Sequence, residues 1–75
     1  MKISYDSEVD ALHIIFRETT VTTHDIAEGI AADYDSEGRL AGIEILDAAA
    51  RLGGKDVFRR VVLEDVATGS APTLR

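Results

Sequence analysis

The 75-residue sequence contains no cysteine, which excludes disulfide bonds, thiolate catalysis and thiolate metal sites. Positive charge is scarce as well, because eight Lys and Arg residues stand against fourteen Asp and Glu, giving a net charge of −6. A chain of this sign repels polyanions, so nucleic acid is not expected as a partner. No apolar run approaches the ~18 residues of a membrane span, and charge returns directly after Met1. We therefore expect no membrane association, no signal peptide and a cytoplasmic location.

The residues that are present describe a small globular chain. Hydrophobic residues make up 45% and charged residues 29%, which is typical of a folded domain. We expect one domain over residues 1–66 and a disordered tail over 67–75, where Thr, Gly, Ser and Pro offer little to bury. A chain of this length buries only about 60% of its unfolded surface. Its marginal stability favours a protein partner or a weak homodimer.

Alternation of apolar and polar residues predicts about five antiparallel strands. In the second strand Leu12, Ile14 and Phe16 point to one side, which we expect a helix to cover. The second and third strands are expected to be neighbours joined by a turn at Thr19-Thr20. The predicted strands are residues 2–5, 11–17, 21–26, 30–34 and 40–46.

The clearest turn runs from Asp35 to Arg39, where Gly38 can adopt the left-handed conformation that closes a three-residue hairpin loop. If Asp35 lies opposite Arg39, then Tyr34 faces Leu40 and Ala32 faces Gly42, unless a bulge alters this register.

A short helix is predicted over residues 47–53, with Asp47 as the N-cap and Gly53 as the stop. Residues 55–66 are ambiguous, and we expect a helical turn followed by a strand over 60–64. The predicted fold is therefore α+β: a small antiparallel β-meander with a short helix packed on one face and a C-terminal helix turn or strand.

The segment Asp33–Glu44 partly matches the twelve-residue calcium loop of helix–loop–helix proteins. Its candidate ligands would be the acidic residues Asp33, Asp35, Glu37 and Glu44. However, the flanks alternate like strands, and in a hairpin Glu44 would lie too far from the turn to close such a site. We expect a hairpin with solvated acids and no metal site.

The two histidines are a further candidate site. With the turn at Thr19-Thr20, His13 and His24 would lie diagonally on one sheet face and, with a nearby carboxylate, could hold zinc or nickel or act as a general base. Two ligands are too few for a convincing site, so half-exposed cross-strand histidines are the favoured interpretation. No nucleophile elbow or phosphate-binding loop is present, and we expect no catalytic residue and no cofactor.

Two parts of the sequence resemble domain-of-unknown-function family 2283, a group of small prokaryotic single-domain proteins. The resemblance rests on KISYD at 2–6 with DAL at 10–12, on the hairpin segment 33–40, and on GIEILDA at 42–48. It implies a small antiparallel sheet with a helix and no established activity. An association of similar proteins with toxin-like genes would imply an antitoxin or immunity role. His13 stands where similar proteins usually carry an aromatic residue.

Three functions follow, in order of preference. The first is a non-enzymatic protein-interaction module, for example an antitoxin-like or immunity-like partner of a basic protein. The second is binding of calcium or manganese through Asp33, Asp35, Glu37 and Glu44. The third is a small enzyme that uses His13 or His24 with a carboxylate.

Overall fold

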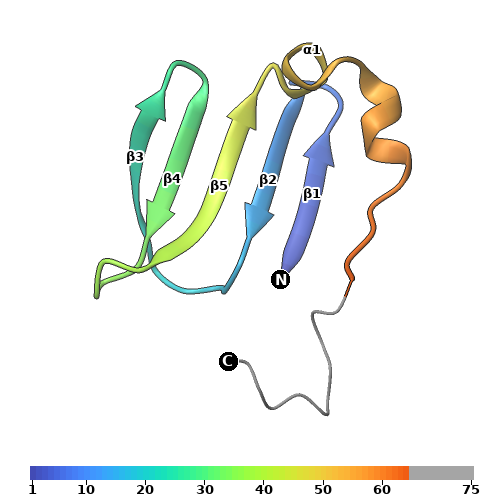
Figure 1. Cartoon of the computed structure of the whole chain (residues 1–75). Helices are drawn as coiled ribbons and strands as arrows, with labels where there is room; N and C mark the ends of the chain where they lie inside the picture. Colours follow the sequence, from blue (N-terminus) through green and yellow to red (C-terminus); the bar gives the residue numbers. More distant parts are fainter. Residues whose placement is uncertain (65–75) are drawn as a thin grey trace.

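The computed structural model describes residues 1–64, and within them it contains five strands and two short helical segments (Figure 1). The predicted tail over 67–75 lies outside the described residues. The elements are β1 (Lys2–Asp6), β2 (Ala11–Ile15), β3 (Thr22–Ala27), β4 (Ile30–Tyr34), β5 (Leu40–Leu46), the α-helix α1 (Ala48–Leu52) and the 3-10 helix η1 (Lys55–Arg59).

The five strands form one antiparallel sheet in the order β1-β2-β5-β4-β3. The antiparallel sheet is as predicted, but the predicted meander is wrong. The second and third strands do not pair, because β5 and β4 lie between them. Residues 16–21 instead run past the ends of β5 and β4 (Figure 1). Six residues can reach about 20 Å, which exceeds the ~14 Å across three strand spacings.

The β4–β5 hairpin has the predicted turn and a shifted register. Asp35 donates its backbone N–H to the Arg39 carbonyl at 2.9 Å, and Gly38 has a φ of 81°. Tyr34 lies opposite Leu40 as expected. An irregularity between Asp33 and Tyr34 then places Asp33, and not Ala32, opposite Gly42. The bulge therefore decides which side chain Gly42 faces.

The register gives the sheet an apolar face and a polar face. Ile3, Ile14, Ile43 and Ala32 follow one another across the strands, so they share a face. Their sequence neighbours point the other way, and these include His13, Asp33 and Glu44. The alternation of side chains along each strand thus determines which residues lie on each face of the sheet.

Helix α1 is held at its start by a residue distant in the sequence. Asp47 is the N-cap residue, as predicted, but it has a φ of 52° and its side chain forms no capping hydrogen bond. Asp10 replaces it: its carboxylate accepts the Ala49 N–H at 2.8 Å, and its carbonyl accepts the Ala48 N–H at 3.0 Å. Gly53 ends the helix in the left-handed conformation, as predicted.

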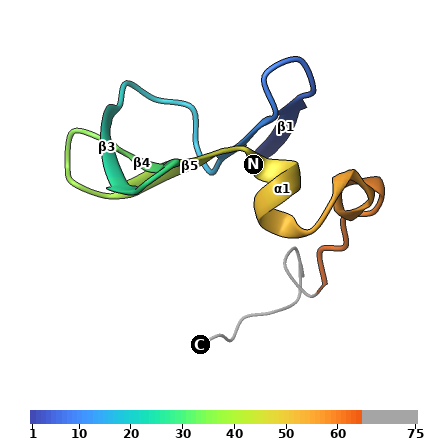
Figure 2. The same ribbon diagram turned by 90° about the horizontal axis from the view of Figure 1, so that it is seen from above.

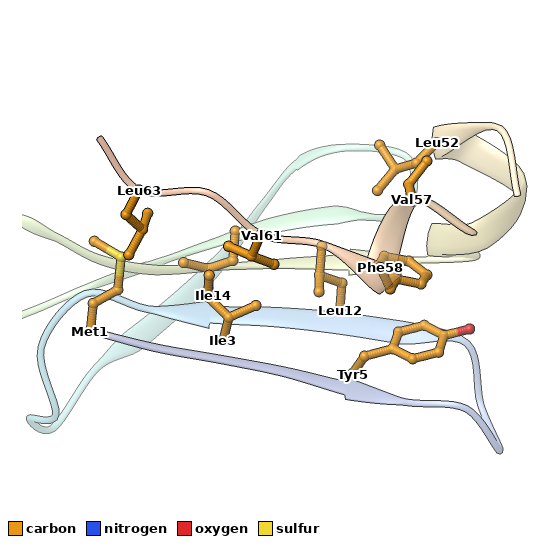
Figure 3. A pocket seen from close by; sticks show the side chains of 10 residues that line it. All are labelled: Met1, Ile3, Tyr5, Leu12, Ile14, Leu52, Val57, Phe58, Val61 and Leu63. Atoms are coloured by element: carbon orange, nitrogen blue, oxygen red, sulfur yellow. The ribbon is translucent and has the colours of Figure 1, made fainter. Parts of the chain in front are cut away.

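Both helical segments lie on one side of the sheet, near β1, β2 and β5 (Figure 2). The predicted packing of the helix over Leu12, Ile14 and Phe16 is not confirmed, since α1 lies at the end of the strands where Asp10 holds it (Figure 1). The segment after η1 crosses above β1 and β2 (Figure 3). The helical turn at 55–59 agrees with the sequence prediction, but residues 60–64 form no strand, which corrects that expectation.

The buried apolar core of the described residues is small. It consists of one leucine and four alanines, and no large side chain within residues 1–64 is fully enclosed. No helix in this part of the chain has the length and apolar character needed to cross a membrane. The sheet therefore leaves much of its apolar surface incompletely covered.

Candidate functional site

Three potential ligand side chains meet on the polar face of the sheet. His13 on β2 is the direct cross-strand partner of Glu44 on β5, and Asp33 comes from β4 on the other side of β5. His13 Nε2 lies 3.2 Å from Asp33 Oδ2 and 3.8 Å from Glu44 Oε2. We call these three residues the His13 cluster. It exists because β5 lies between β2 and β4.

Asp33 is the most enclosed member of the His13 cluster, with only 5% of its surface exposed. The Thr23 hydroxyl on β3 donates to Asp33 Oδ1 at 2.6 Å, which leaves Oδ2 directed at His13. The Thr23 hydrogen bond is the main cause that lowers the pKa of Asp33, and the contact with His13 adds to it against the opposing effect of burial. Asp33 is thus stabilised as a carboxylate within the sheet.

Gly42 provides the space for this carboxylate. A Cβ at this position would lie 2.9 Å from the Ile14 carbonyl oxygen and 3.0 Å from Asp33 Oδ2. Both distances are shorter than ordinary van der Waals contacts, so an alanine would require either the backbone or the carboxylate to shift. The glycine therefore permits the position of Asp33 seen here.

The donor atoms of the His13 cluster all lie within 4.8 Å of one another, and they form the only such group found in residues 1–64. An imidazole nitrogen with two carboxylate oxygens is a donor set that suits divalent transition metals. The same groups could also exchange a proton, since imidazole and carboxylates are ordinary general bases. The side chains of His13 and Glu44 are 33% and 43% exposed, so solvent reaches the cluster.

The other two acids of the candidate calcium loop have different partners. Asp35 accepts hydrogen bonds from the Arg17 and Arg39 guanidinium groups at 2.7 and 2.9 Å. Hydrogen bonds within the turn, led by the Arg39 backbone N–H, lower the pKa of Asp35 to about 2. Glu37 lies 3.6 Å from Arg39 on the exposed turn. His13 thus meets both Asp33 and Glu44, while Asp35 and Glu37 pair with arginines. Asp33 and Asp35 are buried, so the expectation of solvated acids is wrong for these two residues.

The predicted pairing of the two histidines on one face is wrong. His24 lies opposite Ala32 on β3, so its side chain is on the apolar face, whereas His13 is on the polar face. The His24 ring instead meets the Tyr34 ring edge-on, with centroids 5.7 Å apart. This error arose because the sequence analysis paired the second strand with the third.

The sequence contained a signal for the His13 cluster that the prediction did not use. His13 alternates with Leu12 and Ile14, and Glu44 alternates with Ile43 and Ile45, so each lies on the polar side of its strand. Only the pairing of β2 with β5 brings them together, and that pairing joins strands far apart in the chain. Knowledge of the strand order was the missing step.

A second feature lies on the opposite face, where an apolar groove of about 640 Å³ separates β1 and β2 from the segment that follows α1 (Figure 3). The Tyr5 and Phe58 rings stack across one end, with centroids 4.2 Å apart. Val61 and Leu63 line the groove and remain 59% and 61% exposed. The complete lining is Met1, Ile3, Tyr5, Leu12, Ile14, Leu52, Val57, Phe58, Val61 and Leu63.

Comparison with known protein families finds a match. The family model described as "Protein of unknown function (DUF2283)" matches residues 2–48, which cover the whole sheet and the start of α1. No curated protein and no solved structure matches the chain. The His13 cluster lies entirely within the matched region, whereas much of the groove lining lies beyond it.

Proposed function

This chain belongs to the DUF2283 family, and we propose that it acts as a non-enzymatic protein-interaction module that associates through its apolar groove. The observation that carries this proposal is the small core of one leucine and four alanines beside a groove lined by exposed large apolar side chains. Covering such side chains contributes roughly 25 cal/mol per Å² of apolar area removed from water. Association therefore supplies burial that the single chain lacks.

We propose a second copy of the chain as the occupant of the groove, because the charges are divided along the sequence. Residues 1–47 carry eleven acidic and three basic side chains, a net charge of −8. Residues 48–64, which form much of the groove wall, carry four basic and two acidic side chains, a net charge of +2. In a two-fold dimer, the basic segment of each copy can approach the acidic sheet of the other.

A basic partner protein is the second candidate, and the net charge of −8 over residues 1–47 favours it. Such a partner would bind the acidic sheet and not the apolar groove, which is bordered by the segment of net charge +2 over residues 48–64. The antitoxin-like or immunity-like role and the cytoplasmic location stay predictions of this proposal. Co-expression with the product of an adjacent gene, followed by co-purification in high salt, tests the role directly.

Sedimentation equilibrium over a concentration series tests the self-association. We expect the wild-type chain to show a reversible monomer–dimer equilibrium. Val61→Asp places a charge in the groove and should shift the chain to monomer. Ile26→Asp is the matched control, because Ile26 is similarly exposed (57% against 59%) but lies on β3, away from the groove. A monomeric wild-type chain at all concentrations would refute the dimer. A Val61→Asp chain that still dimerises normally would refute the groove as its interface.

A further inference from the structure

The polar face carries a constellation that the proposed protein-interaction role does not use. His13, Asp33 and Glu44 come from three adjacent strands, β2, β4 and β5, and their donor atoms lie within 4.8 Å of one another. A rigid sheet holds the backbone of each residue, so the cluster does not depend on a loop conformation. The groove and this cluster are on opposite faces and can be tested separately.

The arrangement has the features of a built site. Only 5% of the Asp33 surface is exposed. The Thr23 hydroxyl donates a hydrogen bond that fixes one carboxylate oxygen, so that the other faces His13. Gly42 leaves the space that this orientation requires. Hydrogen bonds from neighbouring groups commonly orient metal-binding carboxylates in this way. Asp33 is therefore held in one position before any ligand arrives.

Charge balance also points to a cation. Two carboxylates share one imidazole, and within residues 1–64 neither Asp33 nor Glu44 forms an ion pair with a lysine or arginine. Arg17, which follows β2 in the sequence, is bound to Asp35. A divalent ion would neutralise both acids and coordinate the neutral imidazole.

We propose that His13 Nε2, Asp33 Oδ2 and Glu44 Oε2 bind one divalent transition-metal ion of the zinc type, with the remaining coordination position open to water. Tetrahedral zinc with bonds of about 2.0–2.1 Å to nitrogen and oxygen holds its ligands about 3.3 Å apart. The His13–Asp33 distance of 3.2 Å matches this value, and the His13–Glu44 distance of 3.8 Å needs only a small movement of an exposed side chain. The imidazole ligand distinguishes the site from calcium sites, which are built from oxygen donors.

Isothermal titration of the tag-free, chelator-treated chain with zinc chloride tests this proposal. We expect one ion per chain and a raised Tm at saturating zinc. His13→Gln and Glu44→Gln should each weaken binding by at least about tenfold, since even the loss of a residue that only orients a metal ligand costs about 10–100-fold. Both substituted side chains are partly exposed, so the fold should survive, and far-UV circular dichroism verifies it.

His24→Gln is the matched control, because this histidine lies on the opposite face of the same sheet and should leave zinc affinity unchanged. Glu37→Gln is the matched control for Glu44→Gln, since Glu37 lies on the turn outside the His13 cluster and its loss should leave zinc affinity unchanged. Absence of binding heat and of any Tm change at millimolar zinc would overturn the proposal. Equal affinity of the wild-type and His13→Gln chains would do the same, as would calcium binding as tight as zinc.

Discussion

Asp33 shows how a single residue sets the chemistry of one face of this sheet. A carboxylate with 5% of its surface exposed is costly unless it is hydrogen-bonded, and the Thr23 hydroxyl and His13 ring both meet it. The bulge beside it in the β4–β5 ladder places it over Gly42, the residue with no side chain. The lowered pKa of Asp33 follows from these contacts, with the Thr23 hydrogen bond the largest.

Replacement of Gly42 by alanine is expected to destabilise the protein by about 1–3 kcal/mol, the usual cost of overpacking an enclosed position. The new methyl group would lie 2.9 Å from the Ile14 carbonyl oxygen, which is backbone and cannot rotate away. Urea unfolding measures the change. Gly38→Asn is the control, because Gly38 has open space around it and asparagine tolerates its φ of 81°. An alanine at position 42 that unfolds like wild type would contradict the assigned role of Gly42.

Tyr5 and Asp10 form a second pair with opposite pKa shifts. The Tyr5 hydroxyl donates to Asp10 Oδ1 at 2.6 Å. This bond is the main cause that raises the pKa of Tyr5 to about 12 and lowers the pKa of Asp10 below its ordinary 3.8. The stabilisation linked to Asp10 is present above about pH 4 and is lost as the pH falls through the lowered pKa. The part linked to Tyr5 is present below pH 10 and is lost as the pH rises toward 12.

Tyr5→Phe should therefore lower Tm by a roughly constant amount between about pH 5 and pH 9, and the difference from wild type should shrink at both extremes. Phenylalanine retains the ring that stacks on Phe58, so the comparison isolates the hydroxyl. Thermal melts of the two chains from about pH 3 to pH 12 measure the effect. A difference that stays constant down to about pH 3 would show that Asp10 does not receive a charge-dependent hydrogen bond from Tyr5.

At the scale of elements, α1 depends on a residue 39 positions away in the sequence. Asp10 caps the helix through its carboxylate and its carbonyl, while the adjacent Asp47 forms no side-chain cap. A helix of five residues is too short to be stable alone, so this attachment to the β1–β2 turn fixes where it begins.

Asp10→Ala is expected to lower Tm by about 5 °C, since it removes a helix cap that also anchors the end of the sheet. Asp47→Ala is the matched control, because Asp10 and Asp47 have the same left-handed backbone, with φ of 54° and 52°, and share the backbone cost of alanine there. The Tm change of Asp47→Ala should be the smaller, because the Asp47 side chain caps nothing. Differential scanning calorimetry of the two variants distinguishes these outcomes. If Asp47→Ala were the more harmful substitution, the local cap predicted from the sequence would be the true one.

The contrast between local and distant contacts explains what the sequence could predict. Alternation located all five strands, and the turn at Gly38 and the stop at Gly53 were visible because a glycine must supply a left-handed backbone there. The order of the strands was not visible, since the pairing of β2 with β5 joins distant parts of the chain. That missing order hid the His13 cluster and wrongly placed His24 beside His13. The cap by Asp10 was missed for the same reason.

The whole molecule has two unlike faces and an uneven distribution of charge. The polar face holds the His13 cluster, and the other face bears the groove between β1, β2 and the segment after α1 (Figure 3). Over β3 and β4 no described element covers the sheet (Figure 2). A small chain of this construction has little core to stabilise it as a monomer, so association and folding should be coupled.

Coupling of this kind predicts that Tm depends on protein concentration. Raising the concentration from about 1 to 100 µM should raise the Tm of the wild-type chain, because mass action favours the folded dimer over unfolded monomers. Ile26→Asp should show the same dependence of Tm on concentration. Val61→Asp should lose it, since Val61 lines the groove and Ile26 does not. Scanning fluorimetry at matched buffer conditions measures all three chains. A wild-type Tm that is constant over this range would mean that the groove stays open in the folded protein and that its exposed side chains contribute nothing through self-association.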